Sequence, residues 1–203
     1  MGLPQRSNDQ EFFTYRDYLH CSPDKRLEII YGTVYDMTPA PSPRHQEMLG
    51  AVFLQIAQAL EDSSCRVLPA PVDVLLPRGL EADEETDTVV QPDLVIVCDP
   101  DKIREKNIRG APEWIIEIVS PSTAGHDQIR KRELYEKSGV SEYWIVHPSD
   151  GLVMVYRLED NAYGKPEVME LKDTTRCLAL PGAAVNWDRV MRRLREEGSE
   201  EKI

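Results

Sequence analysis

Two acidic residues lie beside or within short apolar runs, where an unpaired carboxylate is costly to bury. Asp93 precedes the run LVIV, and Glu117 lies inside the run WIIEIV with apolar residues on both sides. A buried carboxylate needs a partner, usually a metal ion, a lysine or backbone N–H groups. The helix-like segment that follows the second run offers Lys131. Two carboxylates on adjacent strands with a lysine nearby can hold a divalent metal against a phosphate.

The segment from about 127 to 138 predicts a helix that ends at Gly139. At about 100° per residue, one face of this helix carries Asp127, Lys131, Leu134, Tyr135 and Ser138, while the other charged residues can face water. Asp127 precedes Lys131 by four residues, in the favourable order of acid before base. Ile129 breaks the pattern because it falls on the outer face. Lys131 is therefore either a site residue or a surface lysine whose aliphatic stem covers apolar neighbours.

Three further polar residues are candidates for the same site, each with a plainer alternative. Glu28 lies in a predicted hairpin, LEIIYGTVYDM, and alternation along the strand also allows it to face solvent. Asp73 interrupts an apolar alternation and faces either the side of Asp93 or water. His45 lies one turn before Met48 and Leu49 on an apolar helix stripe, where it is either near the site or a structural hydrogen-bonding residue.

The elements that must position these residues alternate between helix and strand. Thr14 can cap a short helix, and the hairpin turns at Tyr31-Gly32. Ser42 and Pro43 begin a helix over about 44–61. The sequence then predicts a strand pair in CRVLPAPVDVLLP, an acidic solvated loop GLEADEETD, and the two central strands joined by an exposed connector. Antiparallel strands EYWIVHP and GLVMVYRLE follow, and then a strand near 168–171. The last element is a charged helix, DRVMRRLREE, which is either a surface helix or a subunit contact.

Length and composition indicate one soluble domain over residues 1–203, with a core at about 14–187 and frayed ends at 1–10 and 197–203. We expect no signal peptide, because the start MGLPQRSNDQEFF lacks a basic region followed by an apolar run, and no membrane span, because no apolar stretch is long enough. The net charge of −12 argues against a broad basic surface that coats nucleic acid, although a narrow basic cleft is compatible with it. Only Arg130, Lys131, Arg132 and Lys137 form a local basic cluster.

The four cysteines are Cys21, Cys65, Cys98 and Cys177, and they form no CxxC pair. This scatter favours reduced thiols in a cytoplasmic protein over a disulfide framework or a zinc site. The chain has no GxGxxG, GxxxxGK[ST], GxSxG or HExxH motif, and its four histidines do not cluster at zinc spacing. The carboxylate pair with its lysine is the remaining candidate for chemistry.

Several ordered blocks together resemble the Uma-type restriction endonuclease family of the PD-(D/E)XK superfamily. These blocks are the LEIIYGTVYDM hairpin, the SPRH helix start, QPDLVIV, EIVSPST, the D127–K131–Y135 set and GVSEYWIVHP. They span about 14–187. Each block alone is weak, and their order makes the match specific.

The resemblance implies an α/β (α+β) restriction-endonuclease-like core, in which helices flank a mixed β-sheet, with an N-terminal helix and hairpin. Pro92-Asp93 matches "PD", and Glu117 matches the acid of "(D/E)XK". Val119 stands where the superfamily has its lysine, and a lysine of the following helix is thought to replace it in this family; Lys131 is the best candidate.

The function implied is a Mg²⁺- or Mn²⁺-dependent endonuclease that hydrolyses DNA. Asp93, Glu117 and the carbonyl of Ile118 would bind the metal, and Lys131 would orient the water or stabilise the developing charge. The supporting residues would be Asp73, Glu28, His45, Asp127 and Tyr135.

Two other functions fit the same residues. One is a catalytically inactive nuclease-like module for binding or assembly, which the acidic charge favours. The other is a metal-dependent hydrolase of smaller phosphate esters. In each case we expect a homodimer or higher homo-oligomer, because symmetric dimers are the commonest assemblies.

Overall fold

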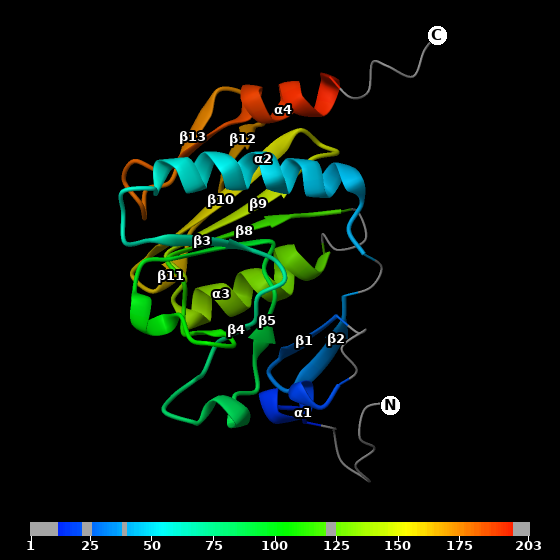
Figure 1. The fold of residues 1–203 in the computed structure, drawn as a ribbon, viewed down its shortest axis with the longest axis vertical. Helices are drawn as coiled ribbons and strands as arrows, with labels where there is room; N and C mark the ends of the chain where they lie inside the picture. The colour runs from blue at the N-terminus through cyan, green and yellow to red at the C-terminus, as the bar shows by residue number, and fades with distance from the viewer. Residues whose placement is uncertain (1–11, 22–25, 38–39, 121–124, 197–203) are drawn as a thin grey trace.

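The computed structural model describes residues 12–21, 26–37, 40–120 and 125–196 (Figure 1). The expected fraying at 1–10 and 197–203 concerns residues outside these ranges. Within the described ranges, no helix is long and apolar enough to cross a membrane.

A mixed seven-stranded sheet forms the centre of the molecule, as the sequence predicts. Its order is β11-β10-β9-β8-β6-β3, and β12 also pairs with β10, off this path. The strands are β3 (Arg66–Pro69), β6 (Leu94–Val97), β8 (Trp114–Ile118), β9 (Glu142–His147), β10 (Leu152–Glu159), β11 (Ala162–Tyr163) and β12 (Glu167–Glu170). Strands β8 and β9 run parallel, whereas the other pairs are antiparallel.

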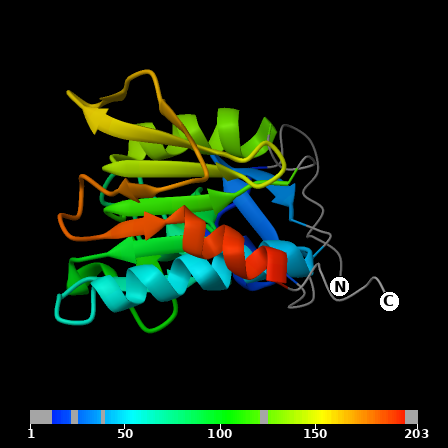
Figure 2. The same ribbon diagram turned by 90° about the horizontal axis from the view of Figure 1, so that it is seen from above.

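Helices cover both faces of this sheet. Helix α2 (Pro43–Ala59) and helix α4 (Trp187–Glu196) lie on one face, with the ribbon β13–β14 (Thr174–Arg176 and Ala184–Asn186) beside them. Helix α3 (Arg132–Ser138) lies on the other face (Figure 2). The central strands are buried on both sides, so they read as continuous apolar runs rather than as alternating ones.

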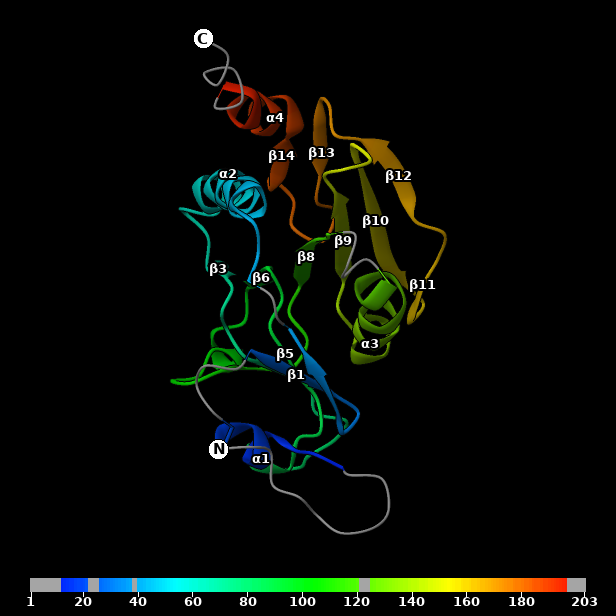
Figure 3. The same ribbon diagram turned by 90° about the vertical axis from the view of Figure 1, so that its right-hand side faces the viewer.

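A smaller five-stranded sheet lies below the face that carries α3 (Figure 3). Its order is β2-β1-β5-β4-β7. The strands are β1 (Leu27–Ile30), β2 (Thr33–Asp36), β4 (Val74–Leu75), β5 (Val89–Val90) and β7 (Ile108–Arg109). The predicted hairpin is β1–β2, and both turn residues have the positive φ of a tight hairpin turn, 51° at Tyr31 and 76° at Gly32.

The helix starts follow the predicted capping residues. Helix α1 (Tyr15–Leu19) begins after Thr14, whose N–H and hydroxyl both donate to the carboxylate of Asp17. Helix α2 begins with Pro43, and the Ser42 hydroxyl accepts a hydrogen bond from the N–H of His45. This cap fixes the first turn of α2, so the position of the His45 side chain is set by the helix start.

Two predictions about the segment from Cys65 to Arg109 are wrong in detail. Strands β3 and β4 form, but they do not pair with each other: β3 joins the central sheet and β4 joins the small one. The proline-rich link between them, 69–73, turns the chain from one sheet to the other. The connector expected to be exposed contains β7, which pairs with β4 in parallel.

The expectation of four reduced cysteines is also wrong. Cys65 and Cys98 form a disulfide, while Cys21 and Cys177 are thiols. The reason is the strand register: Arg66 lies opposite Val97 in the β3–β6 pair, so Cys65 lies opposite Cys98 just beyond it. Scatter along the sequence hides this pairing, because only the register brings the two thiols together.

Candidate active site at the end of β6 and β8

Asp93 and Glu117 are cross-strand neighbours. Leu94 pairs with Ile116 in the antiparallel β6–β8 ladder, so Asp93, one residue earlier, lies opposite Glu117. Directly opposed residues have Cβ atoms about 5 Å apart and point to the same face of the sheet. The two acids that looked misplaced in the sequence therefore meet at one end of the central sheet.

Each of these acids also binds the strand of the other. The Asp93 N–H donates to Glu117 Oε2 at 3.2 Å, and the Ile118 N–H donates to Asp93 Oδ2 at 2.8 Å. His45, from the first turn of α2, places its Nε2 3.0 Å from the same Asp93 oxygen. These contacts hold the Asp93 carboxylate beside Glu117 while leaving it partly open to solvent, with 16% of its side chain exposed.

Lys131 reaches the same place from the opposite helix and is surrounded by acids. Its Nζ lies 2.9 Å from Glu117 Oε1, 2.9 Å from Glu28 Oε1 and 3.6 Å from Asp127 Oδ1. We call these four residues the Lys131 cluster. All four are buried, with Lys131 and Glu28 fully enclosed. The plainer interpretations of Glu28 as a solvent-facing residue and of Lys131 as a surface lysine are wrong.

The local helix geometry explains how Lys131 turns inward. Residues His126–Lys131 form a π-helical segment that continues into α3, which ends at Gly139 with φ 86°. The predicted face is confirmed, because Asp127, Lys131 and Tyr135 are all buried. Ile129 is 68% exposed, on the outer face where the helix geometry places it. A π turn in place of a regular α turn is often found at functional sites.

The acids of the Lys131 cluster differ in their pKa values. Burial alone would raise the pKa of Glu28, but the Lys131 ammonium, His126 and the Gln91 N–H lower it to about 2. Burial raises the pKa of Glu117 well above its usual value despite Lys131, and the charges of Asp127, Asp93 and Glu28 raise it further. Glu28 is thus the ionised partner of Lys131, and Glu117 competes for the same cation.

A model of the Uma2 family, described as "Putative restriction endonuclease", matches residues 10–188. The chain belongs to the Uma2 family. A crystal structure with the same fold is described as "a putative nuclease belonging to DUF820 from Anabaena variabilis ATCC 29413". It superimposes with a TM-score of 0.70 and 19% sequence identity, over 90% of this chain and 99% of that one. No curated protein matches the chain.

Asp73 and the local basic cluster of this Uma2 chain do not lie as the sequence predicted. Asp73 accepts hydrogen bonds from the Tyr18 hydroxyl at 2.8 Å and from Gln91 Nε2 at 2.9 Å, so it lies one residue away from the Lys131 cluster, linked to it through Gln91. The local basic cluster is divided, because Arg130 and Lys137 are exposed and Lys131 faces the interior. Lys131 is buried, while Arg132 pairs with Glu136 and Lys137 with Glu133.

Sequence reasoning missed three residues that hold the cluster together. The Gln91 N–H donates to Glu28 Oε1 at 2.8 Å, and His126 Nε2 lies 3.3 Å from Glu28 Oε2. The Tyr143 hydroxyl donates to the carbonyl of Asp127 at 3.2 Å. Tyr135, which was expected to support the site, donates its hydroxyl to Glu117 Oε1 at 3.1 Å. The signal available was position: Gln91 lies inside the matched block QPDLVIV, and His126 lies next to Asp127.

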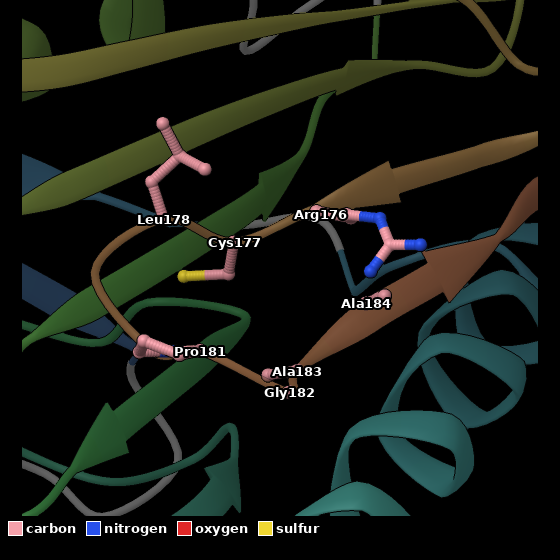
Figure 4. Close-up of a pocket in the computed structure, with 7 residues that line it drawn as sticks. All are labelled: Arg176, Cys177, Leu178, Pro181, Gly182, Ala183 and Ala184. Carbon is pink, nitrogen blue, oxygen red and sulfur yellow. The ribbon is translucent and has the colours of Figure 1, made fainter.

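A pocket of about 250 Å³ lies elsewhere, between β13 and β14. Its lining is Arg176, Cys177, Leu178, Pro181, Gly182, Ala183 and Ala184 (Figure 4). Burial raises the pKa of the Cys177 thiol, so this cysteine is a poor nucleophile. The pocket contains no member of the Lys131 cluster, and its largely apolar lining offers no acid–base pair for chemistry.

Glu28→Gln is expected to lower the free energy of unfolding by about 3 kcal/mol at pH 7. Since the folded pKa of Glu28 is lowered to about 2, its contribution is complete above the usual carboxyl pKa and is lost as the pH falls toward 2. Urea unfolding of the wild type and the variant at pH 7 and at pH 3 measures this contribution to the free energy of unfolding. The difference between wild type and variant should fall to less than about half of its pH 7 value at pH 3; a constant difference would show that Glu28 acts through packing and not through charge.

Proposed function

We propose that this Uma2 chain is an endonuclease that hydrolyses phosphodiester bonds in DNA with Mg²⁺ or Mn²⁺ bound. The observation that carries the proposal is the convergence of Asp93, Glu117 and Lys131, from two adjacent strands and the following helix, at one end of the sheet. The family description and the nuclease-like fold support it.

The donor set fits a hard divalent cation. Asp93, Glu117 and the carbonyl of Ile118 would hold it, all through oxygen, as Mg²⁺ and Mn²⁺ prefer. The described residues contain no group of three or more His, Cys, Asp or Glu side chains arranged to hold a metal. A two-carboxylate site remains suitable, because Mg²⁺ is usually bound through one or two carboxylates, with water and substrate phosphate completing its shell.

Charge balance supports the same assignment. Lys131 is the one cation inside a cluster with three buried acids, and burial with mutual repulsion raises the pKa of both Glu117 and Asp127. Carboxyl groups with raised pKa values bind protons that a divalent cation would displace. A bound cation would also reverse the local sign that otherwise repels a phosphate.

The roles of the side chains follow from their contacts. The metal, when bound, would polarise the scissile phosphate and lower the pKa of a bound water. Lys131 and Tyr135 both hold Oε1 of Glu117, which leaves Oε2 on the side of Asp93. The Lys131 charge, in a water-poor environment, would offset the negative charge that grows on the phosphate.

The test is cleavage of supercoiled, linear and single-stranded DNA during titration with Mg²⁺ or Mn²⁺, with Asp93→Asn as the variant. We expect metal-dependent nicking by the wild type and a loss of at least about 10³-fold in the variant, because a ligand carboxylate is removed. Absence of cleavage together with absence of a metal-induced shift in Tm would refute the proposal. A shift without cleavage would favour a binding module or a hydrolase of smaller phosphate esters.

A further inference from the structure

Arg26 immediately precedes β1 and lies two residues before Glu28. The Met37 N–H donates to the Arg26 carbonyl at 2.9 Å, so the β1–β2 ladder extends to Arg26. Side chains two residues apart on a strand point to one face and are about 7 Å apart. Since Glu28 contacts Lys131, the Arg26 side chain extends along the side of β1 that faces the candidate site.

The Arg26 guanidinium has an unused donor. Its Nε is buried and has no hydrogen-bond partner among the described residues. His45 Nδ1 is a second buried polar atom without such a partner. Burial lowers the pKa of the His45 imidazole, but Asp93 raises it above its usual value; the nearby Arg26 charge opposes that rise, so the two groups without partners are near one another. Buried donors are almost always satisfied, and an exception points to a ligand.

The acids of the site do not act as the missing partner of Arg26. Arg26 forms no ion pair with a carboxylate in the part of the chain that the structure describes, although four acids lie at the site. Lys131, in contrast, is completely enclosed by its three carboxylates, so its ammonium is not free to touch a substrate. Among the described cations near the site, Arg26 is half-buried and has an unpaired donor, whereas Arg130 is exposed and lies over the Tyr35 ring.

We propose that Arg26 is the phosphate-binding residue of this site and donates to the non-bridging oxygens of the phosphodiester that is cleaved. A planar guanidinium matches two phosphate oxygens at once, which an ammonium cannot do. The inference rests on the proposed nuclease function and adds a substrate contact to it. Lys131 then balances the buried acids, and Arg26 binds the substrate.

The experiment compares Arg26→Ala and Arg26→Lys with Arg66→Ala, an exposed arginine at the far end of β3, in cleavage of a short DNA duplex with Mg²⁺. We expect Arg26→Ala to lower kcat/KM by about 10–100-fold, Arg26→Lys to restore part of it, and Arg66→Ala to stay within about twofold. Guanidinium chloride at a low, non-denaturing concentration should raise the activity of Arg26→Ala alone. Wild-type kcat/KM in Arg26→Ala would overturn the inference.

A second measurement separates this inference from the proposed function. With Mg²⁺ present, inorganic phosphate should raise the Tm of the wild type and of Arg66→Ala but not of Arg26→Ala, since a ligand stabilises only a protein that binds it. If no DNA is cleaved by the wild type, the nuclease proposal fails and this shift still decides the role of Arg26. An equal shift in Arg26→Ala, or none in the wild type, contradicts the role of Arg26. If Arg26→Ala does not fold, the same criteria apply to Arg26→Gln, which also removes the charge.

Discussion

Replacement of Lys131 by methionine is expected to lower the free energy of unfolding by about 3–5 kcal/mol at pH 7, because it leaves buried acids without their cation. Methionine keeps most of the length and apolar volume of the lysine stem, so the loss reports the charge. In the wild type, burial would lower the pKa of Lys131, but Glu117, Glu28 and Asp127 raise it well above its usual value. The stabilisation that Lys131 provides is therefore fully present at every pH below the pKa of free lysine.

The pH dependence of Lys131→Met should have the opposite sign to acid denaturation. Without the ammonium, burial raises the pKa of all three acids of the cluster above their unfolded values. Groups of this kind stabilise the fold below the unfolded pKa and lose that contribution as the pH rises. The variant should thus become more stable from pH 8 to pH 5, as measured by urea unfolding.

The matched control is Lys137→Met on the same helix. Lys137 forms an exposed ion pair with Glu133, and exposed pairs contribute about 0–1 kcal/mol. We expect its unfolding to differ little from that of the wild type at either pH. If Lys131→Met lost as little stability as this control, or lost less at pH 8 than at pH 5, the account of the cluster would be wrong.

The two strand acids could be predicted from the sequence because strand periodicity and burial constrain them strongly. An acid at the head of LVIV and another inside WIIEIV cannot both face water, and both runs belong to the middle of a sheet. The helix face of Lys131 was predictable for a similar reason: a fixed angle per residue places Asp127, Lys131 and Tyr135 together. Local geometry was sufficient in these cases.

Contacts between distant segments could not be predicted in the same way. The ion pair of Glu28 with Lys131 depends on how the small sheet sits against the α3 face, and strand alternation alone left Glu28 on either side. The Cys65–Cys98 disulfide depends on the β3–β6 register. Nothing in the sequence pointed to Arg26, because the feature that singles it out is a buried donor without a partner, which only the structure reveals.

Glu28 and Glu117 both contact Lys131, but their pKa values move in opposite directions, and this separates a structural acid from a functional one. Glu28, with its lowered pKa, stabilises the fold as a carboxylate. Glu117, with its raised pKa, is costly to ionise in the fold. Under the proposed function, metal binding is the reason for an acid that opposes folding at neutral pH.

Glu117→Gln is therefore expected to change the free energy of unfolding by less than about 1 kcal/mol at pH 7 without metal, because a neutral isostere relieves repulsion and loses one charged contact. The amide oxygen can still accept from Lys131 and Tyr135, while the amide nitrogen meets the Asp93 N–H less favourably. The same variant should lose the metal-induced rise in Tm and at least about 10³-fold of DNA cleavage.

The comparison with Glu28→Gln makes this prediction sharp, since both changes remove one carboxylate from the same lysine. Urea unfolding and Tm are measured with and without Mg²⁺. Glu28→Gln should be destabilised and still gain stability from the metal, whereas Glu117→Gln should be stable and gain none. Equal destabilisation of the two variants would mean that Glu117 is a structural partner of Lys131. A normal metal response in Glu117→Gln would remove Glu117 from the metal site and leave Asp93 as the remaining candidate ligand on these strands.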